Sequence, residues 1–530
     1  MNRLIIDLHA HPQMKPINSS DAEREMKGIW KKFEESQYCG ELNRQLRNSL
    51  SETKKKSQAN FEQAIEGNVR GVFLAMGPVE RDFFKPDPRH FLLKLILKRR
   101  QYRNLAACIT AFDIQKVDKI FTRIENKKGV NYFNEELMEE YKFLIDQVKK
   151  SQNQPNKMVI AGDYTEFQKH IRDENTITTV LTVEGAHSLG NYAEDEDFSR
   201  NIREANSDIL YNRLMPDFEK NIEKMKTWGG GRHAPFFITI CHHFSNLLAG
   251  HAKSFSPRQG LLTPGMDDLL NQKAGKNEGF SRLGRDVTEL LLSKENGRRI
   301  LIDVKHMSVK ARLKFFRMVE EKYWSRGEEL PLICSHAALS GYKTIEESNR
   351  SDTFRRWRNH YLSRQSINMS DEEARIIARS NGLVGIVLHG GRLPGGRAKQ
   401  QIDNATNVDN DRLRDESIRL IMSNIFQFVR AAGDKKAWDC LCIGTDMDGV
   451  IVPFKIYPNY SQMQNLAIHF YQFFTRPLDL SEIEMDKEQV KEFMYGYDAE
   501  ELTEKLMSQN VLNFMEKYFH EGYLSRGAIV

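Results

Sequence analysis

The stretch Leu4–His11, LIIDLHAH, is an apolar run that ends in two histidines two positions apart. Side chains along a β-strand alternate between its two faces, so His9 and His11 are expected to point the same way from a strand end. Two imidazoles on one side of a strand end can bind a single metal ion, because histidine is the commonest metal ligand in proteins. Taken alone, the pair is equally compatible with two ordinary histidines in a turn.

Short apolar, β-branched runs like Leu4–Leu8 recur along the chain, and longer helical or polar stretches separate them. The runs are continuous rather than alternating, as expected for strands that are covered on both faces. Between two of the runs, Leu283, Val287, Leu290 and Leu291 recur at helical spacing, and Gly297 suits the end of that helix. Eight strands alternating with helices predict an α/β fold, the parallel (β/α)8 barrel. The eight runs are Leu4–Leu8, Gly71–Ala75, Thr178–Val183, Pro235–Cys241, Ile300–Val304, Leu332–Cys334, Leu383–Leu388 and Leu441–Ile443.

Residues of the types that bind metals follow six of the eight runs. The carboxyl ends of barrel strands open onto one mouth, where active sites lie, so these side chains are expected to converge there. They are His9 and His11 after the first run, Glu184 after the third, His242 and His243 after the fourth, His306 after the fifth, His336 after the sixth, and Asp446 and Asp448 after the eighth.

Imidazoles and carboxylates together suit zinc or a similar divalent ion, and this set is large enough for two ions. We expect Glu184, the only carboxylate between the histidine pairs in strand order, to bridge them. The other expected ligands are His9 and His11 on one ion and His306 and His336 on the other. Two ions about 3.5–4 Å apart acidify a shared water to a hydroxide nucleophile. Asp446 is then the candidate acid/base that moves the proton.

Composition excludes several classes of partner. The chain of 530 residues has 78 Lys and Arg against 73 Asp and Glu, and the net charge of +5 is too weak at this length to indicate nucleic acid. No apolar stretch approaches the roughly 18–20 residues that cross a bilayer, and the first apolar run lacks a signal-peptide cleavage site. The six cysteines show no disulfide-framework or zinc-ribbon spacing, so a cytoplasmic protein is expected.

A single barrel domain over residues 1–530 leaves length for large insertions. Residues 12–68 and 77–170 are expected to be mostly helical, and residues 342–380 to be a basic helical stretch. Residues 391–410 are rich in Gly, Gln and Asn and are expected to form a loop.

Six segments resemble the membrane-dipeptidase (renal dipeptidase-like) family of the amidohydrolase superfamily, and they occur in the family's order. They are Val183–Leu189 (VEGAHSL), Thr239–Asn246 (TICHHFSN), Leu301–Val309 (LIDVKHMSV), Ile333–His336 (ICSH), Gly444–Val450 (GTDMDGV) and Asn510–Phe514 (NVLNF). The resemblance implies two zinc ions and hydrolysis of dipeptides or related amides, and it is compatible with a homodimer. The residues it implies are metal ligands at His9, Glu184, His306 and His336, an acid/base at Asp446, and His242 as the group that binds the scissile carbonyl and stabilises the tetrahedral intermediate.

The chain departs from the family pattern at two places. His11 stands where the family usually has Asp, so the site loses one negative charge, and we expect stronger attraction of anionic substrates. The family's arginine, which binds the substrate's carboxylate, has no counterpart at the realigned stretch Ile367-Asn368. Arginines of the insertion just upstream, among them Arg350 and Arg364, are candidates to replace it, and a solvated basic helix is the alternative.

Three functions therefore stay open on the sequence. The first is a zinc-dependent hydrolase of dipeptides or small amides. The second is an amidohydrolase with a non-peptide substrate, such as an N-acyl amino acid, a lactone or a cyclic amide, because one barrel can serve many substrates. The third is a non-catalytic protein that only holds metal, and Asp446 argues against it because such a site needs no acid/base beside its ions.

Overall fold

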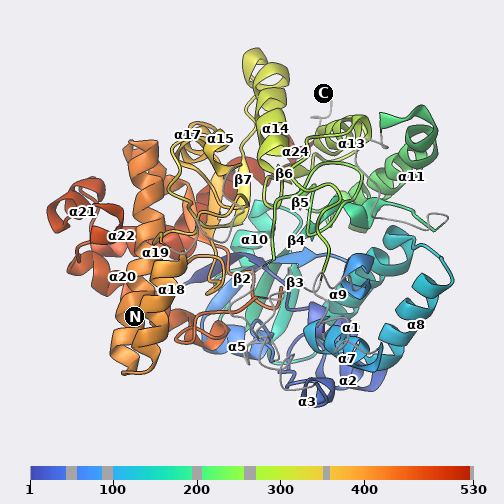
Figure 1. Ribbon diagram of the computed structural model, residues 1–530, viewed down its shortest axis with the longest axis horizontal. Coiled ribbons are helices and arrows are strands. Elements are labelled where there is room, and N and C mark those ends of the chain that lie inside the picture. Colours follow the sequence, from blue (N-terminus) through green and yellow to red (C-terminus); the bar gives the residue numbers. More distant parts are fainter. Residues whose placement is uncertain are drawn as a thin grey trace.

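The computed structural model describes residues 2–42, 56–85, 99–110, 112–193, 206–255, 270–349, 359–449 and 451–525. Eight parallel strands form a closed barrel at its centre, with helices around it (Figure 1). The strands are hydrogen-bonded in the order β2-β1-β9-β8-β7-β6-β5-β4, and pairing of β2 with β4 closes the ring. The predicted (β/α)8 barrel is thus confirmed. Its strands are β1 (Ile5–Ala10), β2 (Val69–Met76), β4 (Thr176–Glu184), β5 (Phe237–Thr239), β6 (Leu301–Asp303), β7 (Ile333–Ala337), β8 (Leu383–Ile386) and β9 (Leu441–Ile443).

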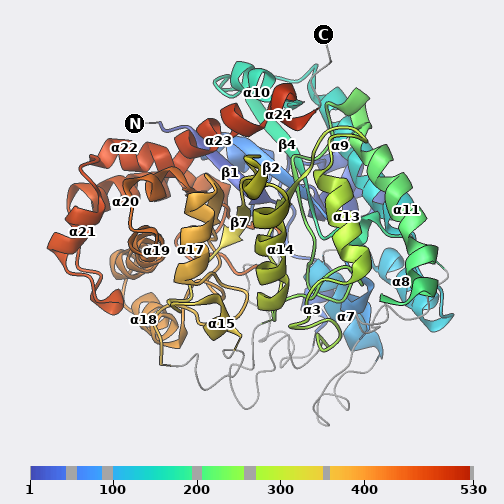
Figure 2. The ribbon, with the colours of Figure 1, turned by 90° about the horizontal axis from the view of Figure 1, so that it is seen from above.

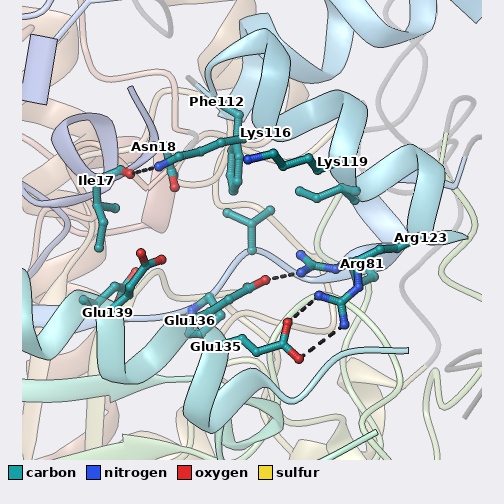
Figure 3. Close-up of a pocket in the computed structure, with 14 residues that line it drawn as sticks. Ile17, Asn18, Arg81, Phe112, Lys116, Lys119, Arg123, Glu135, Glu136 and Glu139 are labelled. Atoms are coloured by element: carbon teal, nitrogen blue, oxygen red, sulfur yellow. Dashed lines mark hydrogen bonds and ion pairs between the residues drawn. The ribbon is translucent and has the colours of Figure 1, made fainter. Parts of the chain in front are cut away.

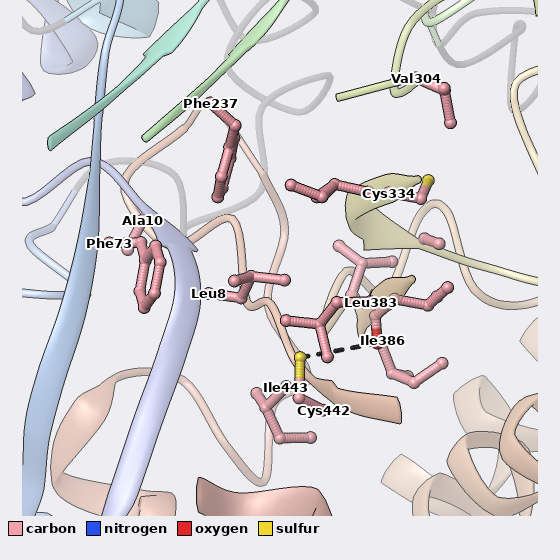
Figure 4. Packing of buried hydrophobic residues seen from close by; sticks show 14 of the residues in the cluster. Leu8, Ala10, Phe73, Phe237, Val304, Cys334, Leu383, Ile386, Cys442 and Ile443 are labelled. Atoms are coloured by element: carbon pink, nitrogen blue, oxygen red, sulfur yellow. Dashed lines mark hydrogen bonds between the residues drawn. The ribbon is translucent and has the colours of Figure 1, made fainter. Parts of the chain in front are cut away.

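The barrel strands are buried along their whole length, which explains their continuous apolar runs. Every residue of β1, β2 and β4 is buried, as strands covered on both faces require. Figure 4 shows the packing of this core, in which the rings of Phe73 and Phe237 stack with centroids 6.0 Å apart. Full burial of each large apolar side chain stabilises the fold by about 1.5–3 kcal/mol. Cys440 and Cys442 are buried free thiols.

Helices cover the outside of the barrel, and Figure 2 shows α11, α13, α14 and α17 following one another along one side of it. Ser281 and Ser308 begin two of these helices, where their hydroxyls accept hydrogen bonds from the backbone N–H of Gly284 and Ala311. Such caps stabilise a helix by about 1 kcal/mol. The helices between and after the barrel strands are α10 (Tyr164–His170), α11 (Asp208–Lys226), α13 (Arg282–Leu292), α14 (Val309–Lys322), α17 (Asp371–Arg379), α19 (Asn410–Ala432), α20 (Met463–Thr475), α21 (Lys487–Phe493), α22 (Ala499–Glu504), α23 (Asn510–Tyr518) and α24 (Glu521–Leu524).

The helix predicted from Leu283, Val287, Leu290 and Leu291 is confirmed as α13, but it ends earlier than Gly297. Its last residue is Leu292, and the chain then turns to extended backbone at Ser293. Gly297, with φ at +116°, belongs to the loop that leads into β6.

Among their described residues, the first two insertions contain several helices, and loops take up much of the stretch 12–68. Within them a short strand, β3 (Lys157–Ile160), pairs with the first half of β4, and the sequence did not reveal it. Four residues are too short a run to stand out from the surrounding helical pattern. The helices of the insertions are α1 (Met14–Asn18), α2 (Asp21–Lys27), α3 (Gln37–Gly40), α5 (Phe61–Glu66), α7 (Arg99–Thr110), α8 (Ile114–Glu125), α9 (Met138–Ser151) and, in the stretch 342–380, α15 (Ile345–Ser348).

The loop predicted for residues 391–410 was wrong, because α18 (Gly396–Thr406) occupies most of it. This helix buries Ala398 and Ala405 and packs against α19. The amide side chains of the stretch lie on the remaining surface of the helix. Packing against a neighbour thus overrides a composition that is typical of a loop.

A disulfide joins Cys39 of α3 to Cys108 of α7. It lies in a satellite apolar cluster, apart from the barrel core, that includes Phe83, Phe244 and Phe255. The two cysteines are 69 residues apart, and this separation carries no pairing signal. Disulfides persist in oxidising compartments and are rare in the cytosol, so the cytoplasmic expectation loses its basis in the cysteines. Among the described residues, no helix combines the length and the apolar character that a membrane crossing requires.

Candidate metal centre

The metal-type residues lie at the carboxyl ends of the barrel strands, where the fold brings them together. Glu184 is the last residue of β4, and His306 and Asp446 follow β6 and β9 with positive φ angles of 65° and 59°. Such backbone angles are unfavourable for residues other than glycine and concentrate at functional sites. The N–H of Asp446 donates to the carbonyl of His9 at 2.9 Å, which ties the two strand ends together.

Two groups of ligand-type atoms share Glu184. In the first group, the Nε2 atoms of His9 and His11 lie 3.4 and 3.1 Å from the Glu184 carboxylate. Asp446 joins this group, with Oδ1 3.5 Å from Nε2 of His11.

The second group consists of Glu184, His306 and His336. The Nε2 atoms of His306 and His336 lie 3.1 and 3.5 Å from Oε1 of Glu184 and 3.2 Å from each other. The membership of the two groups is the one expected from the sequence, with Asp446 added to the first.

The donor set fits divalent metal ions. Nε2 of His9 is buried and has no hydrogen-bond partner among the described residues. Burial lowers the pKa of His306 to about 3, so this imidazole is neutral, the form that binds metal. Burial alone would raise the pKa of Glu184, but the surrounding histidines, His242 and His9 foremost, hold it well below its usual value. An ionised carboxylate beside a neutral imidazole is a typical pair of zinc ligands.

The same site attracts positive charge in the absence of an ion. Burial opposes protonation of His11, yet its hydrogen bonds to Asp446 and Glu184 raise its pKa to about 10. A proton thus sits where the carboxylates converge, and a metal ion would displace it.

His242 lies beside this centre, with Nε2 3.4 Å from Glu184 Oε2 and Nδ1 3.0 Å from Glu80 Oε2. Glu80 also accepts hydrogen bonds from the N–H groups of His243 and Phe244. Burial would raise the pKa of Glu80, but His242 lowers it to about 2, and the two carboxylates in turn raise the pKa of His242. Glu80 therefore fixes the orientation of His242 and favours its protonated form.

Glu80 was missed in the sequence, although it follows β2, one of the two runs to which no metal-type residue had been assigned. The other such run is β8, and His389 and Arg392 follow it. Every barrel strand thus contributes a polar side chain to the mouth region.

A cavity of about 60 Å³ opens at this centre, and it is lined by His306, His336 and Asp446 together with two cations, Lys305 and Arg392. Lys305 is only 3% exposed, and its ammonium has no hydrogen-bond partner among the described residues. Arg392 donates to the side chain of Gln365 and the carbonyl of Ser254. Both cations were missed, because their position depends on how the loops fold back over the mouth.

The arginines proposed from the sequence lie elsewhere. Arg364 contacts Nε2 of His360 at 3.1 Å and lies over the ring of Tyr342, so it does not line this cavity. Arg350 lies outside the described residues. Ile367 of the realigned stretch does line the cavity, together with Arg392.

Two further residues beside the site, His243 and Asp448, make different contacts. Strand alternation would turn His243 away from His242 and into the barrel wall, yet it lines the cavity and bonds Ser254 Oγ at 2.7 Å. The alternation does not apply to it, since β5 ends at Thr239. Asp448 accepts hydrogen bonds from the N–H groups of Gln58 and Ala59, so it holds a loop in place.

No protein-family model matches this chain, and no curated protein matches it. Several solved structures are similar. One is a metallopeptidase from Rhodobacter sphaeroides, liganded with a phosphinate mimic of the dipeptide L-Ala-D-Ala. Its sequence identity to this chain is 14% and the TM-score is 0.45, and the alignment covers 97% of this chain and 99% of that chain. A metallopeptidase named dipeptidase AC is 15% identical in sequence, with a TM-score of 0.43, and the alignment covers 98% of this chain and 99% of that chain. An amidohydrolase from Pseudomonas aeruginosa is 14% identical in sequence, with a TM-score of 0.42, and the alignment covers 86% of this chain and 91% of that chain.

Proposed function

We propose that this chain is a hydrolase of dipeptides or related small amides that works with two divalent metal ions, zinc being the best match to the donors. The observation that carries the proposal is the pair of donor groups that share Glu184. His9 and His11 would hold one ion, and His306 and His336 the other. Such ions acidify water and polarise a carbonyl oxygen.

Asp446 is the acid/base in this proposal. It lines the cavity, and its carboxylate oxygens lie 3.5 Å from His11 Nε2 and 3.9 Å from His336 Nε2. Its side chain is 13% exposed, more than those of Glu184 and the four histidines of the two groups. It can therefore take a proton from the attacking water and deliver it to the leaving amine.

His242 stabilises the oxyanion that forms at the scissile carbonyl. Glu80 holds its Nδ1 side, which leaves Nε2 directed at the centre. A protonated imidazole oriented in advance favours charge that develops in the transition state over the neutral ground state.

The substrate carries a carboxylate close to the scissile bond. Burial and Arg392 lower the pKa of Lys305 to about 8, so most of its ammonium stays charged at neutral pH. This buried cation lines the cavity without a hydrogen-bond partner, and a substrate carboxylate would supply one. His11 in place of an acidic residue adds to the preference for anions. A dipeptide and an N-acyl amino acid both meet this requirement, whereas an uncharged lactone does not.

The test combines metal analysis with turnover on a panel of dipeptides, some with a D-residue at the C-terminal side, and of N-acyl amino acids. We expect two metal ions per chain, and we expect Asp446→Asn to lower kcat by about 10²- to 10⁴-fold with the metal retained. Asp415→Asn, an exposed change on α19, serves as the matched control. Turnover only on N-acyl amino acids would select that substrate class, and fewer than one ion per chain would overturn the proposal.

A further inference from the structure

A second cavity, of about 280 Å³, lies between the helices of the first two insertions (Figure 3). It is bordered by α1, the loop after β2, α8, and the segment that runs from a π-helical turn, Phe133–Leu137, into α9. Single π-turns within helices are rare and frequently mark functional sites. The cavity is larger than the one at the metal centre and is near the lower end of the volumes that hold small molecules.

Charges of opposite sign line opposite walls of this cavity. Lys116 and Lys119 extend from α8, and Glu139 faces them from α9 (Figure 3). Glu140, the next residue of α9, also lines the cavity. The wall between them is apolar and includes Val79, Phe112 and Ile120.

Ion pairs occupy one end of the cavity only. Arg81 pairs with Glu136, and Arg123 pairs with Glu135 (Figure 3). Lys119, Glu139 and Glu140 have no ion-pair partner within the described part of the chain. The arrangement therefore offers separate positive and negative groups to a ligand.

Glu140 is the strongest sign of a missing partner. The residue is only 7% exposed, and the N–H of Gly77, 2.8 Å from its Oε2, is its only hydrogen-bond partner among the described residues. Burial raises its pKa to about 8, although the N–H of Gly77 and the charge of His11 act in the opposite direction. Nη1 of Arg81, which lines the same cavity, is also buried without a hydrogen-bond partner. Buried polar groups in native proteins are normally satisfied, so the unpartnered Nη1 of Arg81 and the buried Glu140 carboxyl, which has a single hydrogen bond among the described residues, point to a polar ligand.

We propose that this cavity binds a free amino acid in its zwitterionic form. The ammonium lies at Glu139 and Glu140, the carboxylate at Lys116 and Lys119, and an apolar side chain packs on the wall that includes Val79. Peptide hydrolysis releases such a molecule, so the source of the ligand rests on the proposed function. The chemistry of binding does not depend on that function.

Glu140 also bonds the segment that packs on the metal centre. Gly77, which donates to Glu140, packs so closely on the backbone of Glu184 that a Cβ at this position would lie 2.8 Å from the Glu184 carbonyl oxygen. Glu140 thus contacts both the cavity and the segment beside the shared metal ligand.

The test is calorimetric titration of the metal-loaded full chain with L-leucine, and with leucine amide and N-acetylleucine, which each lack one charge. We expect saturable binding of leucine and at least tenfold weaker binding of both analogues. Glu140→Gln, which keeps an acceptor for Gly77, and Lys119→Met, an exposed change, should each weaken leucine binding at least tenfold. Lys149→Met, an exposed change on α9 away from the cavity, should leave it unchanged.

The outcomes separate this inference from the proposed function. Leucine binding that disappears on metal removal but is unchanged in Glu140→Gln and Lys119→Met would place the amino acid at the metal centre and overturn the inference alone. Absence of saturable binding would overturn it as well. Binding with the expected variant pattern in a protein that hydrolyses no dipeptide or N-acyl amino acid would support the cavity and overturn the proposed function.

Discussion

The roles of single residues at this site depend on their neighbours more than on their own type. His242 and His243 are adjacent in the sequence, yet one bonds Glu80 through its side chain and the other bonds Ser254. A buried carboxylate beside an imidazole selects its protonated form, while a hydroxyl does not.

Replacing Glu80 tests this difference. In Glu80→Gln we expect kcat to fall roughly 10- to 100-fold, as for other residues that orient catalytic groups. Because the carboxylate raises the pKa of His242, its loss should also move the alkaline limb of the kcat profile to lower pH. The measurement is kcat against pH, with Glu62→Gln, an exposed change on α5, as the control. An alkaline limb that stays in place would contradict the role of Glu80.

Replacing Lys305 tests the preference for anionic substrates. A hydrogen bond to a charged group contributes about 1.5–3 kcal/mol, so Lys305→Met should raise KM for a dipeptide roughly 10- to 100-fold. The matching dipeptide amide, which lacks the carboxylate, should be affected far less. Steady-state kinetics on the two substrates measures the difference, and Lys310→Met, on the exposed face of α14, is the control. Equal effects on both substrates would show that Lys305 does not bind the carboxylate.

At the scale of elements, the sequence predicts what depends on local pattern. The barrel strands were predictable because burial on both faces requires continuous apolar runs, and α13 because its leucines repeat at helical spacing. β3 and α18 were not predictable, since β3 is only four residues long and α18 depends on packing against α19.

The candidate site divides in the same way. His9, Glu184 and His306 could be placed together because the barrel itself brings strand ends to one mouth. Glu80 and Arg392 could not, because both lie beyond their strands in loops whose paths depend on tertiary contacts. Lys305 stood in a recognised motif, but its missing partner becomes visible only in three dimensions.

The disulfide between α3 and α7 is predicted to stabilise the insertions rather than the barrel. Closing a loop of 69 residues restricts the unfolded chain by about 4 kcal/mol in the loop-entropy account. Cys39→Ser with Cys108→Ser should therefore lower the denaturant midpoint, and a reductant should have the same effect on the unaltered protein. Urea unfolding with and without reductant measures both. If a reductant still lowers the denaturant midpoint of the double variant, its effect comes from other thiols, and the predicted role of this disulfide is wrong.

At the scale of the whole molecule, the metal centre couples stability to pH. In the metal-free protein His11 has a pKa raised to about 10 from 6.5. A raised pKa contributes stability below pH 6.5 that is lost as the pH rises towards 10. Metal binding displaces that proton and becomes more favourable over the same range.

Removal of the metal should therefore lower Tm more at pH 9 than at pH 6. Differential scanning calorimetry with and without a chelator measures the two differences, and the variant His11→Ala should reduce their dependence on pH. A chelator effect of equal size at both pH values would show that His11 does not exchange a proton for metal.

The pairing of β1 with β9 has a consequence for biosynthesis. The backbone N–H of Thr445 donates to the side chain of Asp7, 438 positions earlier in the chain, and Asp446 and His9 meet at the same seam. A nascent chain emerging from the ribosome presents its first histidines long before the strand that encloses them is made. In the proposed function, metal loading is therefore expected only after β9 has been made, because a chain that stops short of β9 carries most of the candidate ligands without the wall that confines them.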